Sequence, residues 1–323
     1  MNRNQKILAG INPSQQVGLE IGPLFSPIVT RAMGPVRYVD HASTEALRAK
    51  YAHDPNVNVA AIVEVDYVWG EQRLDQLTAA DAPFDYVIAS HVIEHVPDLI
   101  GWLQEIHQIL KPGGILSLAI PDKRSCFDYQ RPVSRPSDVV DAFLRGARKP
   151  SPRQIFDHLA SAVTWRGAIA WDGLPNETEL VPVHTLEEAW QRAHTAYRQD
   201  SYCDVHCWVF TSASFIDLLR ALIRLGLLDY RIAHFFDTTG CEFYVSLEAL
   251  DLSQDAETRK QAQFASLPHG QTQAPVGSEA GISHSDVAPS LASGQPSTLS
   301  LIAQLKQSLP PPWKRSLKQL LKR

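Results

Sequence analysis

Residues 84–120 read FDYVIASHVIEHVPDLIGWLQEIHQILKPGGILSLAI and carry the clearest structural signal in the chain. Residues 86–89 form a short apolar, β-prone run, which is typical of a strand buried on both faces. Apolar side chains then recur at helical spacing from Leu99 to Leu110. Pro112 and two glycines end that helix, and residues 115–120 form a second apolar run. A strand, a helix and a strand joined in this way predict a parallel crossover unit.

The first half of the chain repeats this alternation. Residues 17–22 and 36–39 read as two strands, residues 43–51 as a short helix, and residues 60–65 as a third strand. This order predicts an α/β fold, with a parallel sheet and helices on both of its faces. In such sheets, ligands bind beyond the C-terminal ends of the strands, so polar residues at those ends are candidates for a site.

Composition narrows the class of protein. The chain has 323 residues, 44% of them hydrophobic, which is enough for one large α/β domain with additions. Its formal net charge of −5 argues against nucleic acid as a partner. Four cysteines in a chain of this length indicate reduced thiols and a cytoplasmic location. No signal peptide and no apolar run long enough to cross a bilayer is expected.

The first turn distinguishes between two kinds of nucleotide cofactor. Asp40 follows the glycine-bearing turn by roughly 20 positions, the spacing that places a carboxylate on ribose hydroxyls. A dinucleotide also needs a glycine-rich turn close to its pyrophosphate. Here Gly22 is followed by Pro23, Leu24 and Phe25, and the last two side chains would obstruct that approach. S-adenosylmethionine has no phosphate and tolerates such a turn.

Several of these features together resemble one family. Glu20-Ile21-Gly22, Asp40, Asp66, the run FDYVIASHVIEHV and LKPGG before a strand look like a class I S-adenosylmethionine-dependent methyltransferase. The likeness is greatest to the generic methyltransferase domains of bacterial surface-glycan and small-molecule enzymes. It covers residues 15–125 and 205–248. It implies a Rossmann-like, doubly wound, seven-stranded sheet whose last strand is antiparallel, with S-adenosyl-L-methionine as the cofactor.

The resemblance also implies roles for single residues. Glu20 and Gly22 would lie under the methionine and ribose, and Asp40 would bind the ribose hydroxyls. Asp66 and Tyr67 would face the adenine. The expected cofactor contacts, which include two residues near the sulfonium, are Glu20, Gly22, Pro23, Asp40, His41, Asp66, Tyr67, Ser90 and His91.

Candidate catalytic residues lie in two places. In YCDVHCW, an extended backbone would turn Asp204 and His206 to one face, and a carboxylate that orients a histidine makes a general base. His95, just after the first quoted strand, is a further candidate for removing the acceptor's proton. Cys203, His206 and Cys207 could suggest zinc, but the alternation splits them between faces, so no metal is expected.

The chain divides into five segments. Residues 1–125 are predicted to form the cofactor-binding part, and residues 126–205 a helical insertion or cap that contains helices near 137–145 and 186–198. Residues 206–250 supply the closing helix and strands. Residues 251–300, rich in Ser, Gln, Ala, Gly and Pro, are predicted to be a disordered linker. Residues 301–323 form a basic amphipathic tail, suited to the inner face of the membrane or to a protein partner.

Two functions of different kinds follow. The first is methyl transfer from S-adenosylmethionine to a hydroxyl or similar acceptor, with a sugar of a surface glycan as the expected substrate. The second is a catalytically inactive scaffold of the same fold in a glycan-assembly complex. A nicotinamide-dependent oxidoreductase is disfavoured by Leu24 and Phe25, and cofactor binding separates the first two.

Overall fold

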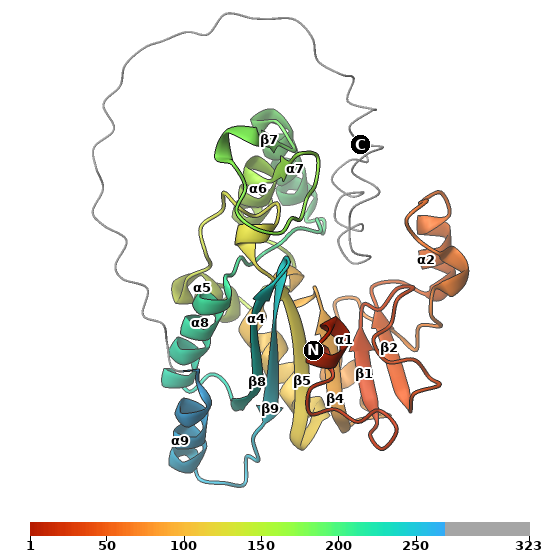
Figure 1. Ribbon diagram of the computed structural model, residues 1–323, viewed down its shortest axis with the longest axis vertical. Helices are drawn as coiled ribbons and strands as arrows, with labels where there is room; N and C mark the ends of the chain where they lie inside the picture. Colours follow the sequence, from red (N-terminus) through yellow and green to blue (C-terminus); the bar gives the residue numbers. More distant parts are fainter. Residues whose placement is uncertain (269–323) are drawn as a thin grey trace, which may run out of the picture.

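The computed structural model describes residues 1–268, which form an α/β fold around a seven-stranded sheet (Figure 1). The strand order is β3-β2-β1-β4-β5-β9-β8. The first five strands pair in parallel, and β9 is antiparallel to both of its neighbours. The predicted Rossmann-like sheet with an antiparallel last strand is therefore confirmed. The strands are β1 (Gly18–Ile21), β2 (Val36–Asp40), β3 (Tyr67–Val68), β4 (Phe84–Ser90), β5 (Leu110–Pro121), β8 (Tyr230–Thr239) and β9 (Glu242–Ala249).

Helices and loops cover both faces of this sheet. The apolar stripes of α4, α5 and α8 join the strands in the largest hydrophobic cluster. Apolar residues of α1 and of the segment after β1 pack on the opposite face. The helices outside the insertion are α1 (Arg3–Ile7), α2 (Thr44–Tyr51), α3 (Leu74–Leu77), α4 (Leu99–Ile109), α8 (Ser212–Arg224) and α9 (Ala256–Ser266).

The predicted crossover unit is present. Strand β4 is buried along its centre, as its apolar run indicates, and α4 returns the chain to the parallel strand β5. Asp98 caps α4, since its carboxylate accepts a hydrogen bond of 2.9 Å from the Gly101 amide. Gly113 adopts a φ of +79°, which allows the reversal after the helix. The polar residues that follow β4 are thereby placed at the C-terminal edge of the sheet.

The predicted third strand, residues 60–65, is wrong. Residues 59–61 form a single 3₁₀ turn, and β3 begins later, at Tyr67, which pairs with Val39 of β2. The apolar side chain of Ile62 packs instead with Leu24 and Leu47 beside α2. An apolar run shows that a segment is buried but not against which element, so the edge strand was placed too early in the chain.

The insertion, residues 126–205, is more than a helical cap. Its first helix packs with α4 and α8, so it belongs to the helical layer of the sheet. The remaining elements form their own small core and lie above the sheet in the view of Figure 1. They include a two-stranded antiparallel sheet that was not predicted. The elements are α5 (Pro136–Leu144), α6 (Pro152–Ser161), β6 (Val163–Trp165), β7 (Leu180–Pro182) and α7 (Leu186–Gln199).

The predicted disordered linker, residues 251–300, is wrong in its first part, because α9 lies there. Gln263 is buried, and its side-chain amide donates hydrogen bonds of 2.7 and 3.1 Å to the carbonyls of Leu228 and Tyr230. Leu267 completes the contact with the core. Its polar composition does not predict this helix, because the helix is stabilised by a few contacts with distant parts of the fold.

Residues 269–300 of the predicted linker and the tail at 301–323 lie outside the described residues. Within residues 1–268, no helix has both the length and the apolar character needed to cross a membrane.

We expect Gln263→Ala to lower the free energy of unfolding by about 1–3 kcal/mol, because two buried carbonyls lose their donor. Urea denaturation measures this change. Gln261→Ala is the control, since Gln261 is exposed on the same helix and its loss should change stability by less than about 0.5 kcal/mol. Equal, small effects of the two substitutions would contradict the packing of α9.

Candidate active site

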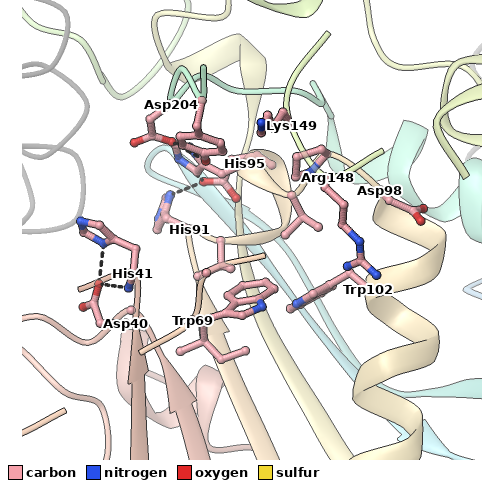
Figure 2. A pocket seen from close by; sticks show the side chains of 18 of the residues that line it. Asp40, His41, Trp69, His91, His95, Asp98, Trp102, Arg148, Lys149 and Asp204 are labelled. Atoms are coloured by element: carbon pink, nitrogen blue, oxygen red, sulfur yellow. Dashed lines mark hydrogen bonds and ion pairs between the residues drawn. The ribbon is translucent and has the colours of Figure 1, made fainter. Parts of the chain in front are cut away.

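A cavity of about 480 Å³ opens at the C-terminal ends of β1, β2 and β4. This size is ordinary for a pocket that takes a small ligand. The sheet side is lined by Gly22, Asp40 and the segment that follows β4, and the insertion lines the opposite side (Figure 2). The lining residues from the insertion are Ala147, Arg148, Lys149, Tyr202 and Asp204, and His206, the first residue after the insertion, also lines the cavity.

Glu20 holds the segment after β1 in place. Its buried carboxylate accepts hydrogen bonds of 2.7 and 3.0 Å from the amides of Ile28 and Val29. Glu20 therefore shapes the turn and does not line the cavity, whereas Gly22, with a φ of +70°, does. Leu24 packs into the hydrophobic cluster beside α2, and neither Pro23 nor Leu24 faces the cavity.

Asp40 lies at the end of β2, where its buried carboxylate faces the cavity. Its Oδ1 accepts hydrogen bonds from the amide and from Nδ1 of His41, at 2.8 and 2.7 Å (Figure 2). His41 in turn contacts Lys50, with 2.9 Å between Nε2 and Nζ. This corner of the cavity is thus built by β2 and α2.

Asp66 and Tyr67 do not reach the cavity. Asp66 accepts hydrogen bonds of 2.8 Å from both the Tyr38 amide and the Arg31 guanidinium, and the Tyr67 hydroxyl donates to Asp81. Because β3 begins later than predicted, the residues beyond it line the cavity instead. They are Trp69, Gly70 and Glu71.

The turn after β4 is fixed by Glu242, the first residue of β9. His91 adopts a left-handed φ of +55°, and its Nε2 donates to the Glu242 carboxylate at 2.7 Å. Arg3 binds the same carboxylate at 2.7 Å and the Ser90 hydroxyl at 2.7 Å. Burial alone would raise the pKa of Glu242, but hydrogen bonds and charges from His91 and Arg3 lower it to about 2.

His95 forms a pair with Asp204. Nδ1 of the imidazole lies 2.8 Å from the Asp204 carboxylate. Burial alone would lower the pKa of His95, but the charge and hydrogen bond of Asp204 raise it to about 9. The same pairing holds the pKa of Asp204 well below its usual range, although burial opposes this.

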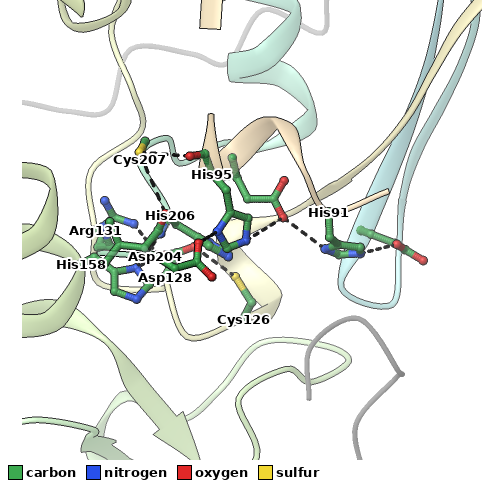
Figure 3. Close-up of polar contacts among 12 residues, drawn as sticks. His91, His95, Cys126, Asp128, Arg131, His158, Asp204, His206 and Cys207 are labelled. Atoms are coloured by element: carbon green, nitrogen blue, oxygen red, sulfur yellow. Dashed lines mark hydrogen bonds and ion pairs between the residues drawn. The ribbon is translucent and has the colours of Figure 1, made fainter. Parts of the chain in front are cut away.

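His206 forms a second pair, with Asp128. Its Nδ1 lies 2.5 Å from one oxygen of Asp128, and the guanidinium of Arg131 binds the other oxygen at 2.7 Å. The His206 amide also donates to Nδ1 of His158 at 3.2 Å. Burial would raise the pKa of Asp128, but His206 and Arg131 hold it far below its usual range. Figure 3 shows this buried cluster beside His95.

The predicted partnership of Asp204 with His206 is therefore wrong. The segment that carries them forms no strand, and each histidine takes a different carboxylate. The rings of His95 and His206 meet edge to face with centroids 4.6 Å apart. The two histidine–carboxylate pairs therefore lie next to each other. Sequence reasoning missed Asp128, whose distance of 78 residues from His206 leaves no local signal.

Hydrogen bonds hold the segment just after the insertion, residues 206–208, against the turn after β4. The amides of Cys207 and Trp208 both donate to the carbonyl of Glu94, at 2.7 and 3.1 Å. The Trp208 indole donates to the Val96 carbonyl at 2.6 Å. His95 and His206 come together because these bonds join the segments that carry them.

Glu94 is among the polar residues that follow β4, at the predicted ligand edge, but the sequence analysis gave it no role. Its side chain is 0% exposed, and within residues 1–268 neither carboxylate oxygen has a hydrogen-bond partner. Nδ1 of His91 lies 3.5 Å away and Nε2 of His95 3.9 Å away from Oε1. Burial would raise the pKa of Glu94, but its contact with His91, together with the charges of His91 and His95, lowers it. Its position directly after a buried strand, beside His95, was the available signal.

Residues 34–222 match the family model of a methyltransferase domain. The chain belongs to this family. The prediction of an S-adenosylmethionine-dependent methyltransferase domain is thereby confirmed. Ubiquinone biosynthesis O-methyltransferases are similar to this methyltransferase, at 27% identity over 172 residues for that of Methylobacterium and 31% over 121 residues for that of Ruegeria pomeroyi.

These alignments are partial. They cover 53% and 34% of this methyltransferase, and they span 64% and 48% of the two relatives' own lengths. A methyltransferase of Methanosarcina mazei overlaps 76% of the chain and 97% of its own, with 14% identity and a TM-score of 0.38. The 1,6-didemethyltoxoflavin-N1-methyltransferase of Burkholderia thailandensis, with S-adenosylhomocysteine bound, overlaps 77% and 76%, with 13% identity and a TM-score of 0.37. Overlap at these scores is loose, so the fold assignment rests on the strand order.

We expect Glu242→Gln to destabilise the methyltransferase in a pH-dependent way. A carboxyl whose pKa falls from 4.5 to about 2 on folding contributes on the order of 3 kcal/mol above pH 4.5. That contribution is lost as the pH falls from 4.5 through 2, so the difference between wild type and variant should shrink to less than half by about pH 3.

Urea unfolding at several pH values measures this difference. Glu248→Gln is the control, because Glu248 lies on the same strand but pairs with Arg231 at the surface. Its loss should cost less than about 1 kcal/mol. A Glu242→Gln effect that does not change with pH would show that the Glu242 charge is not what holds the turn.

Proposed function

We propose that this methyltransferase transfers the methyl group of S-adenosylmethionine to a hydroxyl oxygen of a small acceptor. The observation that carries the proposal is the convergence of two imidazoles, each oriented by its own carboxylate, in the wall of the cavity. An imidazole held in this way can take the proton that a hydroxyl must lose before it attacks. The names of the two relatives, both O-methyltransferases, also favour an oxygen acceptor.

The residues along the sheet edge fit the cofactor. S-adenosylmethionine supplies an electrophilic methyl group and brings a ribose, an adenine and a positive charge. Asp40 offers a buried carboxylate at the end of β2 for the ribose hydroxyls. Gly22, which has no side chain, lets the cofactor approach the backbone of the turn after β1. Trp69 presents an aromatic ring on the same side of the cavity, suited to the adenine (Figure 2).

The remaining predicted cofactor contacts divide by position. His41, Ser90 and His91 line the cavity, and we propose them as cofactor contacts. Glu20 acts through the turn that it holds. The other three predicted contacts, Pro23, Asp66 and Tyr67, lie outside the cavity lining.

Of the two imidazoles, we assign proton removal to His206. Asp204 has one strong cationic partner, His95, whose raised pKa keeps a proton on that ring near neutral pH. Asp128 divides its charge between His206 and Arg131, so it can orient His206 while Arg131 balances part of its charge. His95 then serves as a fixed positive charge beside the reacting oxygen.

The acceptor enters from the insertion side, where Arg148, Lys149 and Tyr202 line the cavity. The sequence predicts a sugar of a surface glycan, and the names of the relatives favour an intermediate of ubiquinone biosynthesis. Both classes present a hydroxyl, and an acceptor panel of phenols, catechols and nucleotide sugars separates them.

We expect His206→Ala to lower kcat by about 10²–10⁴-fold, because the hydroxyl loses its proton acceptor. The Kd of S-adenosylmethionine, measured by titration calorimetry, should stay within about twofold of the wild-type value. His53→Ala, on the exposed surface, is the control for removing an imidazole. An equal loss of turnover and cofactor affinity would overturn the assignment of His206.

We expect Asp40→Asn to weaken binding of S-adenosylmethionine and S-adenosylhomocysteine by about 10- to 100-fold, since hydrogen bonds to a charged group contribute about 1.5–3 kcal/mol. Asp66→Asn is the matched control and should change affinity little, because Asp66 faces Arg31 and not the cavity. If folded wild-type protein binds neither ligand at millimolar concentration, the inactive-scaffold alternative holds instead.

A further inference from the structure

Three side chains at the inner wall of the cavity point ligand atoms toward one space. Glu94, His95 and His206 each offer one such atom, and these atoms lie within 4.8 Å of one another. We propose that Glu94, His95 and His206 bind a divalent transition-metal ion such as Zn²⁺, with one coordination position open to the cavity.

The two imidazoles are already oriented as metal ligands. Nδ1 of His95 is taken by Asp204 and Nδ1 of His206 by Asp128, at 2.8 and 2.5 Å. On each ring one nitrogen is thus held by a carboxylate, and metal-binding histidines almost always have such a carboxylate or carbonyl partner on the nitrogen that does not bind the metal. The two carboxylates come from different parts of the chain, and each orients an imidazole beside the same small volume (Figure 3).

Glu94 supplies the third ligand and the strongest reason for an ion. A carboxylate that is fully buried without a hydrogen bond is costly. Of the neighbouring imidazoles, His91 is 3.5 Å away and is also tied to Glu242 through its other nitrogen. A cation between Glu94 and the two Nε2 atoms would satisfy this carboxylate.

The donor set indicates which ions fit. Two imidazoles and one carboxylate suit Zn²⁺ and other first-row transition ions, whereas Mg²⁺ and Ca²⁺ prefer oxygen ligands alone. Three protein ligands with an open fourth position are typical of a catalytic zinc site. Nε2 of His95 lies 3.9 Å from Oε1 of Glu94, and small side-chain rotations would bring both to bonding distance of about 2.0–2.2 Å from one ion.

The role of the ion rests on the proposed function, although its binding does not. An acceptor hydroxyl at the open position would lose its proton to solvent more readily, because a divalent cation lowers the pKa of a bound oxygen. The methyl carbon then forms its bond to that oxygen as its bond to sulfur breaks. The roles assigned above to His206 and His95 apply to the ion-free protein. With the ion bound, both rings are neutral ligands, and the ion supplies the positive charge and activates the hydroxyl.

The test uses the full chain without a histidine tag, stripped with a chelator and titrated with Zn²⁺ by calorimetry and with Co²⁺ by visible absorption. We expect one ion per chain and the d–d bands of a low-coordinate nitrogen and oxygen site. Glu94→Gln, which preserves shape, should weaken binding by at least about 100-fold, as should His206→Gln. Circular dichroism checks that both variants fold.

Cys203→Ser is the control, because that thiol lies outside the cluster and should leave affinity and spectrum unchanged. The proposal is overturned if folded protein binds no ion at millimolar concentration, if Glu94→Gln keeps wild-type affinity, or if Cys203→Ser removes the site. Methyl transfer is assayed separately on stripped and loaded protein. Ion binding without turnover would count against the proposed function alone, and turnover without ion binding against the metal site alone.

Discussion

Glu242 accepts hydrogen bonds from Arg3, His91 and Tyr244, and so joins the N-terminal helix, the turn after β4 and the closing strand at one buried carboxylate. The turn needs this support because His91 is held in a left-handed backbone conformation, which is uncommon for a residue with a β-carbon. The positions of Glu94 and His95 depend on that turn. The ion pairs of Glu242, at the start of β9, with Arg3 of α1 and with His91 therefore fix where the polar atoms of the cavity lie.

The insertion completes the site from its two ends. Asp128 lies near its beginning, and Asp204 and His206 lie where the chain returns to the sheet. Burying so many charged groups would be unfavourable unless each were paired. Asp128 meets this condition through Arg131 and His206, and the backbone bonds to the Glu94 carbonyl hold the returning segment in place. Glu94 has two imidazoles within 4 Å but, among the described residues, no hydrogen-bond partner, and buried groups of this kind concentrate at functional sites.

The parts of the fold that follow from local sequence could be predicted. Residues 84–120 specify a buried strand, a capped helix and a second strand within a short span, and their apolar spacing is enough to identify all three. The positions of Asp40 and Gly22 could be predicted in the same way, because each lies at the end of a strand that the sequence predicts. The short edge strand β3 was misplaced because its pairing with β2 depends on two residues and not on an apolar run.

The pairing of side chains within the site could not be predicted. Alternation suggested Asp204 with His206, which are neighbours in sequence, but the backbone there is not a strand and the partners come from elsewhere. Asp128 lies in a segment without local pattern, and only the docking of the insertion brings it to His206. Helix α9 was missed for a related reason, since buried contacts such as those of Gln263 are invisible in composition.

The central claim is that His95 and His206 are both fixed by a carboxylate at Nδ1 and share one space at Nε2. Long-range proton–nitrogen NMR spectra of the protein labelled in its histidine rings test this most directly, with assignments made from His95→Gln and His206→Gln. We expect a proton on Nδ1 of both rings, and loss of that signature for His206 in Asp128→Ala. A ring of either residue that carries its proton only on Nε2 would contradict the account.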